Sequence, residues 1–208
     1  MAGWWDKVVV PRLIRCACAA PGIMDLRGKV VPLAQGEVFE LGCGGGLNQR
    51  FYRAGAVTGF AGLDPSQLGL EQSREEAARK GWQADLRQGE GEAIPFEDAR
   101  FDTVVCTYTL CSVHSPARVL AELRRVLKPG GRLLFAEHGA APDPSVARWQ
   151  RRIEPVWKRI AGGCHLTRPV IAGIEAAGFA VTPGGRRYID KTPRFAGWME
   201  WGEAVRGA

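Results

Sequence analysis

The sequence has no long apolar run. No stretch of its 208 residues approaches the roughly 18 uninterrupted apolar residues that a membrane-spanning helix needs. An export signal is not expected either, because Asp6 and Arg12 lie where its apolar segment would be. These absences predict a cytoplasmic protein.

Paired cysteine motifs are also missing. No two cysteines have the CxxC spacing that is typical of zinc sites, and several lie in apolar runs or tight loops. We therefore expect reduced thiols and no metal. The six cysteines are Cys16, Cys18, Cys43, Cys106, Cys111 and Cys164.

A concentrated basic surface is not evident, although the net charge is +6. Lysines and arginines are spread along the chain, apart from a cluster between Arg148 and Arg168. A nucleic-acid binder would gather them on one face or helix. We expect no nucleic-acid partner.

Short apolar segments alternate with helix-length segments, and this order predicts a mostly parallel sheet in an α/β domain. The length and the 46% hydrophobic content suit one core. Helices are expected at 66–81 and 116–128, the second ended by Pro129 and two glycines, with another near Leu26–Leu33. The candidate strands are Val38–Leu41, Gly59–Leu63, Phe101–Thr107, Arg132–Glu137 and Phe179–Thr182.

A glycine-rich turn follows the first of these strands. Gly42, Gly44 and Gly46 allow the backbone to approach a ligand and to adopt angles that a Cβ would forbid. A dinucleotide-binding turn requires a further glycine where Leu47 stands, which disfavours a dehydrogenase.

Two acids accompany this turn. Glu40 ends the strand before it and is placed to face a cationic amino group. Asp64 ends the next strand, 22 residues after Gly42, where a carboxylate can accept both hydroxyls of a ribose. A turn or helix cap is the alternative role for an acid beside Pro65.

Four segments in order across residues 38–137 resemble class I S-adenosylmethionine-dependent methyltransferases: the two strand–turn units above, GEGEAIPF before the strand at Phe101, and ELRRVLKPGG at 122–131. The resemblance implies a Rossmann-like, doubly wound, mostly parallel seven-stranded sheet with an antiparallel edge strand. It also implies S-adenosylmethionine as cofactor, with Glu90 and Gly91 beside the adenine. The predicted cofactor site is Glu40, Gly42, Cys43, Gly44, Asp64, Pro65, Glu90, Gly91, Glu92 and Thr107.

Other segments are similar to the alkyl thiol S-methyltransferases of the vertebrate methyltransferase-like group: 104–113, the Glu137-His138 pair, 154–157 and 163–168. This likeness implies a small lipophilic thiol or sulfide as methyl acceptor. Those enzymes have a hydrophobic N-terminal membrane anchor, which this sequence lacks, so membrane residence is not predicted from the likeness.

The expected chemistry is an in-line displacement, which depends mainly on aligning the acceptor with the methyl carbon. A thiol ionises near pKa ~8.5 and needs only modest help from a base. The predicted catalytic residues are His138, Thr107 and Tyr108. For His138 the alternative is a hydrogen bond to the loop at Gly139, and for the two hydroxyls it is local backbone bonding. His114 and His165 are expected mainly to orient loops, and a covalent cysteine intermediate is disfavoured because direct displacement needs none.

The insert after the fifth strand places apolar residues at helical intervals over 147–160, with Pro155 expected to kink or split the helix. We expect its apolar side to roof the pocket and its arginines to face solvent. The alternative is peripheral contact with an anionic membrane. The predicted substrate pocket is Trp4, Trp5, Tyr108, His138, Trp149, Trp157 and His165, with the two N-terminal tryptophans in a lid or, alternatively, in a packed helix.

The expected organisation is one domain over 1–208: a helical or lid segment at 1–37, a cofactor-binding core at 38–137, a substrate-side insert at 139–168, and a C-terminal helix with edge strands at 169–208. Two alternative functions remain open. One is N- or O-methylation of a small molecule or phospholipid headgroup, and the other is a non-catalytic sensor or partner subunit that only binds the cofactor. Either a monomer or a homodimer is consistent with the sequence.

Overall fold

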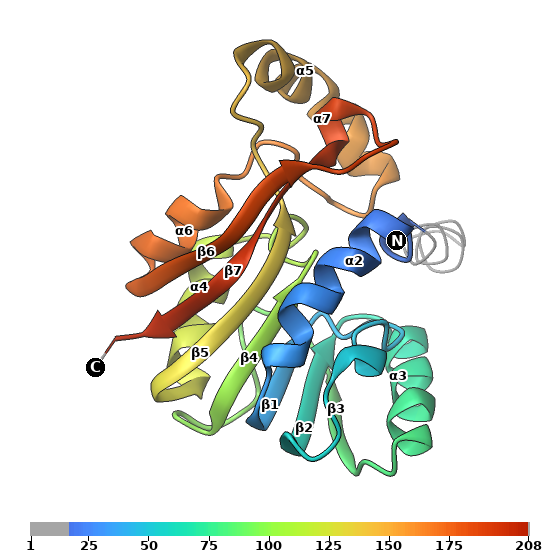
Figure 1. Cartoon of the computed structure of the whole chain (residues 1–208), viewed down its shortest axis with the longest axis vertical. Helices are drawn as coiled ribbons and strands as arrows, with labels where there is room; N and C mark the ends of the chain where they lie inside the picture. Colours follow the sequence, from blue (N-terminus) through green and yellow to red (C-terminus); the bar gives the residue numbers. More distant parts are fainter. Residues whose placement is uncertain (1–16, 208) are drawn as a thin grey trace.

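A single twisted sheet of seven strands forms the centre of the molecule (Figure 1). The computed structural model describes residues 17–207. The strands lie in the order β3-β2-β1-β4-β5-β7-β6. Their bounds are β1 Gly36–Leu41, β2 Val57–Asp64, β3 Ala84–Gln88, β4 Phe101–Thr107, β5 Leu127–His138, β6 Phe179–Tyr188 and β7 Trp198–Arg206.

The pairing confirms the predicted mostly parallel, seven-stranded α/β sheet. Strands β3, β2, β1, β4 and β5 pair in parallel, and β7 is antiparallel to both β5 and β6. The one antiparallel strand therefore lies one place inside the edge, where it joins β6 to the rest of the sheet.

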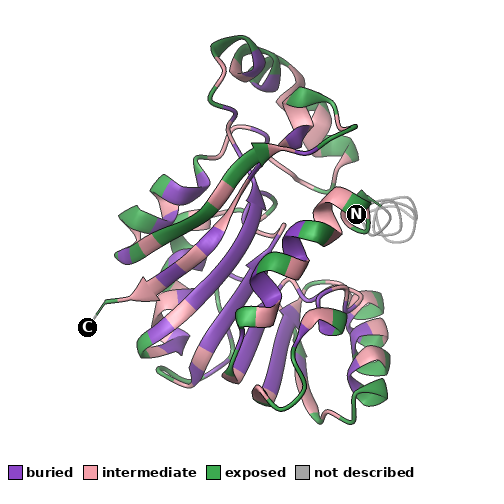
Figure 2. Ribbon diagram, in the orientation of Figure 1, coloured by how far each residue is buried: buried purple, intermediate pink, exposed green. Residues whose placement is uncertain are grey.

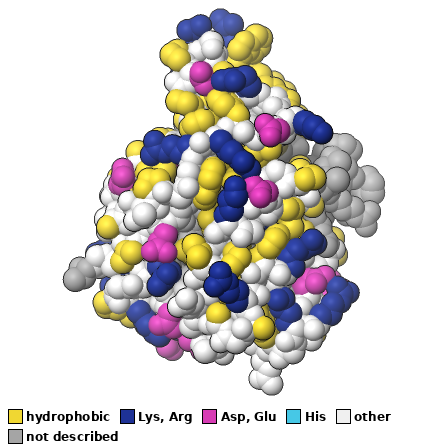
Figure 3. Space-filling model, viewed as in Figure 1, with side chains coloured by type: hydrophobic (Ala, Val, Ile, Leu, Met, Phe, Trp, Pro, Cys, Tyr) yellow, Lys and Arg dark blue, Asp and Glu magenta, His cyan; other side chains and the backbone are white. Residues whose placement is uncertain are grey.

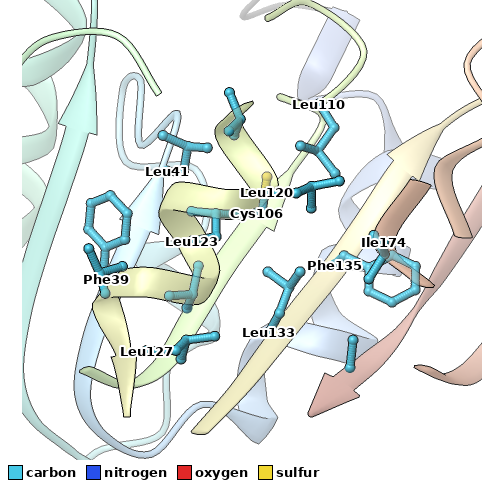
Figure 4. Close-up of a cluster of buried hydrophobic side chains, with 14 of the residues drawn as sticks. Phe39, Leu41, Cys106, Leu110, Leu120, Leu123, Leu127, Leu133, Phe135 and Ile174 are labelled. Carbon is cyan, nitrogen blue, oxygen red and sulfur yellow. The ribbon is translucent and has the colours of Figure 1, made fainter. Parts of the chain in front are cut away.

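Helices cover both faces of the sheet, as the alternating order of segments predicted. The longer helices are α2 Pro21–Val30, α3 Gln67–Arg79, α4 Pro116–Val126, α5 Pro144–Ile160 and α6 Val170–Ala176. Side chains of α2 and α3 pack in one apolar cluster with Val38, Val105 and Leu134 of the sheet. Side chains of α4 and α6 pack on the opposite face in a second cluster (Figure 4).

The strands supply both clusters because successive residues point to opposite faces. In β4, Val105 belongs to the α2–α3 cluster, whereas its neighbours Val104 and Cys106 belong to the α4–α6 cluster. All three are fully buried, and burial is continuous along the central strands (Figure 2). This continuous burial is typical of a sheet covered on both faces.

Two helices begin at serine caps. The Ser66 hydroxyl accepts a hydrogen bond from Gly69 N (3.2 Å) at the start of α3, and the Ser115 hydroxyl accepts one from Arg118 N (3.4 Å) at the start of α4. Such caps satisfy backbone donors that have no partner inside the helix. Both helices occupy the predicted segments, and α4 runs directly into β5.

Some elements differ from expectation. Strands β3 and β7 were not among the candidate strands, although edge strands were expected within 169–208. Only Leu86 is buried in β3, so its sequence has no apolar alternation. Pro155 lies inside α5, but the helix continues through it to Ile160 and is not split. No helix among residues 17–207 is both long and apolar enough to cross a membrane.

The carboxyl ends of the parallel strands meet at one edge of the sheet, at the top of Figure 1. Helix α5 follows β5 at this edge, and the short helix α7 Arg194–Gly197 lies against it. The Trp157 and Phe195 rings join the two helices with centroids 5.6 Å apart. Ligands of open α/β sheets bind at this edge.

Candidate active site

A cavity of about 370 Å³ opens where β1, β2 and β4 end. Its lining residues include two walls. The glycine wall comprises Glu40–Gly45, Asp64 and Pro65, and the second wall comprises Cys18, Arg27, Tyr108, Ser112, Val113 and Gly162. A larger hollow of about 820 Å³ between α4 and α6 contains none of these residues.

The glycine turn is shaped by backbone angles that only glycine adopts readily. Gly42 has a φ of 69°, and a Cβ at this position would lie 2.1 Å from the Thr109 hydroxyl oxygen. Gly44 has a φ of 45°, and its N–H donates to Asp64 Oδ2 at 2.8 Å. The turn therefore presents backbone close to the cavity, as the sequence predicted.

Asp64 lines the cavity and also stabilises the glycine turn by accepting backbone hydrogen bonds. Its Oδ2 accepts from Gly44 N, and its Oδ1 accepts from Ser66 N at 2.8 Å. Burial raises the pKa of this carboxyl, while the two N–H groups act in the opposite direction. Asp64 therefore has the turn-forming role that was the alternative for it, while the helix cap is Ser66 and the ribose contact stays a prediction.

Glu40 is fully enclosed behind the turn. Its carboxylate accepts from Asn48 Nδ2 at 3.0 Å and from the Tyr52 hydroxyl at 2.8 Å. Burial raises its pKa to about 7, although these two hydrogen bonds and the charge of Arg27 lower it. A cation entering the cavity would favour the ionised form of this acid.

The segment after β3 lines another side of the cavity. Gly89, Glu90 and Gly91 are lining residues, as predicted for the last two. Glu92 does not line the cavity, and its Oε1 accepts from Ser115 N at 2.8 Å. The chain turns at this point, with Ala93 N donating to Glu90 O at 3.2 Å, so neighbours in sequence need not share a cavity.

A buried arginine is the main feature of the second wall. Arg27 lies on α2 with only 5% of its surface exposed, and its Nη1 donates to Asn48 Oδ1 and to the Thr107 hydroxyl, both at 2.6 Å. Its guanidinium carbon lies 4.9 Å from the centroid of the Tyr108 ring. Its Nε is buried without a partner among the described residues. A fixed positive charge thus lies beside the end of β4.

Thr107 and Tyr108 both line the cavity where they were predicted. The Thr107 hydroxyl oxygen accepts from Arg27 and from Asn48 Nδ2, at 2.9 Å in the second case. Tyr108 has a φ of 56°, which is uncommon for a residue with a side chain. Such conformations cluster at functional sites.

Glu137 fixes the backbone that follows Tyr108. Its Oε1 accepts from Thr109 N at 2.8 Å and from Leu110 N at 3.1 Å. Burial raises the pKa of this carboxyl to about 7. The side chain has no exposed surface, and its Oε2 has no partner among the described residues.

His138 and His165 lie behind the second wall and do not line the cavity. His138 is buried, with Nδ1 3.8 Å from Cys164 Sγ and with Nε2 unpartnered among the described residues. His165 Nδ1 lies 3.2 Å from Glu154 Oε1, consistent with its expected loop-orienting role. A catalytic role for His138 stays a prediction.

The orientation expected for α5 is corrected by the structure. Trp149, Val156 and Ile160 are 58%, 61% and 56% exposed, so this apolar stripe faces solvent and does not roof the cavity. Trp157 is partly buried against Phe195, and it too is not a lining residue. The spacing of apolar residues correctly identified an apolar face on α5. That face is broader than the part of α5 that the neighbouring elements cover.

Trp4 and Trp5 lie outside the described residues, and their predicted pocket role stays a prediction. No group of three or more histidine, cysteine, aspartate or glutamate side chains between residues 17 and 207 could hold a metal ion.

Sequence reasoning missed most of the second wall. Arg27 and Thr107 are 80 positions apart, and Arg27 and Asn48 are 21 apart, so no local motif contains them. Cys18 and Gly162 also reach the cavity from distant segments. An arginine within the apolar face of a predicted helix was the one available signal for Arg27.

The cavity fits S-adenosylmethionine. The position of Gly42 has no room for a Cβ, so backbone forms the floor, as a bulky nucleoside ligand requires. Asp64 and Glu90 are acceptors suited to ribose hydroxyls, and Gly91 lines the cavity beside them. Glu40 supplies the acid expected near an amino group.

Comparison with known proteins agrees with this geometry. Residues 39–135 match the model of a methyltransferase domain. Thiol S-methyltransferase TMT1B of Homo sapiens is 37% identical over 190 residues, covering 89% of this chain and 72% of the human protein. The Rattus norvegicus protein of the same name is 41% identical over 160 residues, covering 76% of this chain and just under two thirds, 64%, of its own length.

Other chemistries occur among the relatives. Phosphatidylethanolamine N-methyltransferase of Cereibacter sphaeroides is 36% identical over 121 residues, covering 57% of this chain and 58% of the relative. A solved structure from Thermotoga maritima, described as a SAM-dependent methyltransferase and possible histamine N-methyltransferase, covers 97% of both chains with a TM-score of 0.65 at 18% identity. From the match with the methyltransferase domain and the similarity to the human relative, the chain belongs to the class I S-adenosylmethionine-dependent methyltransferases.

Proposed function

We propose that this protein transfers the methyl group of S-adenosylmethionine to a small lipophilic thiol or to sulfide. The observation that carries the proposal is the likeness to the human thiol S-methyltransferase over 89% of the chain. At that coverage the aligned part includes α5 and the loop after it, outside the methyltransferase-domain match at 39–135. The similarity therefore extends to the second wall as well as to the glycine wall.

Bound S-adenosylmethionine supplies an electrophilic methyl group on a sulfonium. The residues of the second wall suit an anionic acceptor, because the Arg27 guanidinium is buried beside Tyr108. A nearby positive charge lowers the pKa of a thiol, whose ordinary value of about 8.5 is already close to neutral pH. Thr107 acts by holding Arg27 in place, since its hydroxyl oxygen accepts from that side chain.

Methylation of an amine, including a phospholipid headgroup, is the main alternative. An ammonium group would be repelled by Arg27, which disfavours this acceptor at the second wall. A protein that binds the cofactor without turnover is the alternative from another class.

The test is a methyl-transfer assay with the purified protein and a panel of alkyl thiols, sulfide, amines, phenols and phosphatidylethanolamine. We expect S-adenosylhomocysteine to form with thiols, faster for longer alkyl chains. Turnover of amines without thiols would contradict the proposed acceptor. Tight cofactor binding with no turnover on the whole panel would favour the sensor.

We also propose that α5 rests on an anionic membrane surface and thereby draws lipophilic acceptors toward the cavity. Trp149, Val156 and Ile160 lie seven and then four positions apart, so they form one stripe along the helix. Exposed arginines flank it, and hydrophobic and basic side chains gather over α5 at the top of Figure 3. Interfacial helices combine these two features. The flanking arginines are Arg148, Arg151, Arg152 and Arg159.

Sedimentation with vesicles tests this contact. We expect binding to phosphatidylglycerol vesicles at low salt, and little binding to phosphatidylcholine vesicles. The triple change W149S, V156S and I160S should abolish binding, whereas L33S, which alters another exposed apolar side chain (41% exposed), should not. No sedimentation of the unaltered protein with anionic vesicles would overturn the proposal.

A further inference from the structure

Hydrogen bonds join the loop after α5 to the loop after β4 behind the second wall. The loop after α5 reaches the loop after β4 through His165 N, which donates to Cys111 O at 2.8 Å. Arg168 adds hydrogen bonds from its guanidinium to Leu110 O and, at 2.6 Å, to Val113 O. Both loops also contribute to the cavity, through Gly162 on one side and Ser112 and Val113 on the other. Their relative position therefore helps to shape the second wall.

Two cysteines and a histidine meet at this junction. Cys164 Sγ lies 3.8 Å from His138 Nδ1, and the hydrogen bond from His165 N to Cys111 O brings the backbone of Cys111 beside the residue that follows Cys164. Cys111 is buried, while Cys164 is partly accessible. Neither sulfur has a place in the proposed methyl transfer.

The surroundings favour a thiolate on one sulfur and a thiol on the other. The interactions with Cys111 and then with His138 lower the pKa of Cys164, against the opposing effect of burial. The same contact raises the pKa of Cys111, as burial also does. An ionised, accessible cysteine beside a protonated one is the arrangement of a peroxide-reactive pair.

The other described cysteines do not share these features. Cys43 and Cys106 are buried, and burial raises the pKa of both thiols. Cys18 lines the cavity, and burial raises its pKa, to which the charge of the nearby Cys164 adds. Cys18 is therefore the competing partner that an experiment must distinguish from Cys111.

We propose that Cys164 and Cys111 form an oxidation-sensitive thiol pair that links the two loops through a disulfide when the protein meets hydrogen peroxide. The Cys164 thiolate attacks a peroxide oxygen, the O–O bond breaks, and the leaving hydroxide takes a proton to become water. The resulting sulfenic acid is attacked by the Cys111 sulfur, an S–S bond forms, the S–O bond breaks, and a second water leaves. Two thiols are oxidised and one peroxide is reduced.

The disulfide has a consequence for the cavity. It would hold Ser112 and Val113 at a fixed position relative to Gly162, and it would remove the thiolate that faces His138. We expect the oxidised protein to turn over its acceptor at least ~10-fold more slowly, in a manner that a dithiol reductant reverses.

The test uses the full chain treated with hydrogen peroxide and read by mass spectrometry. We expect the intact mass to fall by about 2 Da and a linked peptide to contain Cys164 and Cys111. C111S should stop at a sulfenic acid on Cys164 that a dione probe traps, and C164S should form no disulfide. C18S, the matched control, should still form the bond.

Three results would overturn the proposal: a disulfide between Cys164 and Cys18 in the unaltered protein, undiminished disulfide formation in C164S, or oxidation of Cys106 before Cys164. These outcomes are read from masses and do not depend on methyl transfer. Failure of the thiol-methylation proposal would therefore leave this test intact.

Discussion

The two walls of the cavity are built in different ways. The glycine wall comes from two adjacent parallel strands, and its shape depends on backbone angles and on one carboxylate that binds backbone N–H groups. The second wall brings together α2, the end of β4 and the loop after α5, and side chains hold it together. Local sequence determines the first wall, whereas packing between distant segments determines the second.

The largest expected effect comes from placing a side chain in the glycine wall. G42A would add a Cβ 2.1 Å from the Thr109 hydroxyl oxygen, and overpacking of this kind costs about 1–3 kcal/mol. We expect cofactor affinity to fall about 100-fold by calorimetry. G55A is the matched control, since Gly55 has a similar φ of 77° but open space around it. Equal losses in both variants would mean that backbone angle alone, without the close approach, matters.

Removing the Asp64 carboxylate should have the next largest effect on cofactor binding. D64A leaves the N–H groups of Gly44 and Ser66 without their acceptor and removes the acid that is predicted to face the ribose. The expected loss of cofactor binding is about 1–3 kcal/mol, the range for hydrogen bonds to charged groups. Unchanged affinity in a folded D64A protein would show that the ribose is held elsewhere.

Arg27 tests whether the second wall serves the acceptor. With R27Q we expect kcat/KM for a thiol to fall about 10-fold and its pH profile to move upward, because the buried positive charge no longer favours the thiolate. Cofactor affinity should change far less than in D64A. R27K, which keeps the charge, should recover part of the rate. A loss confined to cofactor binding would assign Arg27 to the glycine wall instead.

The smallest expected effect concerns stability and pH. The Glu137 pKa is about 7 in the folded protein and near its ordinary value of 4.5 in the unfolded chain. The folded state therefore retains a proton that the unfolded state loses, and this contribution to stability is complete below pH 4.5 and disappears as the pH rises through 7.

E137Q should reduce this dependence, because its amide does not titrate. We expect the unaltered protein to lose more free energy of unfolding between pH 5 and about pH 7.5 than E137Q loses, measured by urea denaturation without cofactor. E71Q, on the exposed face of α3, is the control. The unaltered protein should keep some slope from Glu40, whose pKa is raised in the same way. Identical slopes in E137Q and the unaltered protein would contradict the prediction.

Much of the fold could be predicted because apolar periodicity was clear in the buried elements. Strand β4 is buried almost throughout, and α4 buries Val119, Leu120, Leu123 and Val126 along one face. Strand β3 lies at the sheet edge with one buried residue, and its sequence carries no such signal. Periodicity also could not indicate which part of the broad apolar face of α5 would meet α7 and which would meet solvent.

The residues of the candidate site also fall into those that the sequence could predict and those that it could not. The glycine turn and Asp64 were predicted because a short strand–turn–strand unit contains both the residues and their geometry. Arg27 could not be placed, since its partners Asn48 and Thr107 become neighbours only after α2 packs on the sheet. The prediction that His138 faces the acceptor stays a prediction, and its Nδ1 lies 3.8 Å from Cys164 Sγ, a neighbour that the sequence did not indicate.

The position of β7 bears on the order in which the chain folds during synthesis. β6 is made before β7, yet it reaches the sheet only through β7, which is inserted between it and β5. Until Trp198–Arg206 has left the ribosome, β5 has an open edge and β6 has no strand to pair with. Open strand edges favour pairing with other chains. Nascent protein should therefore depend most on chaperones in the interval between the emergence of β6 and that of β7.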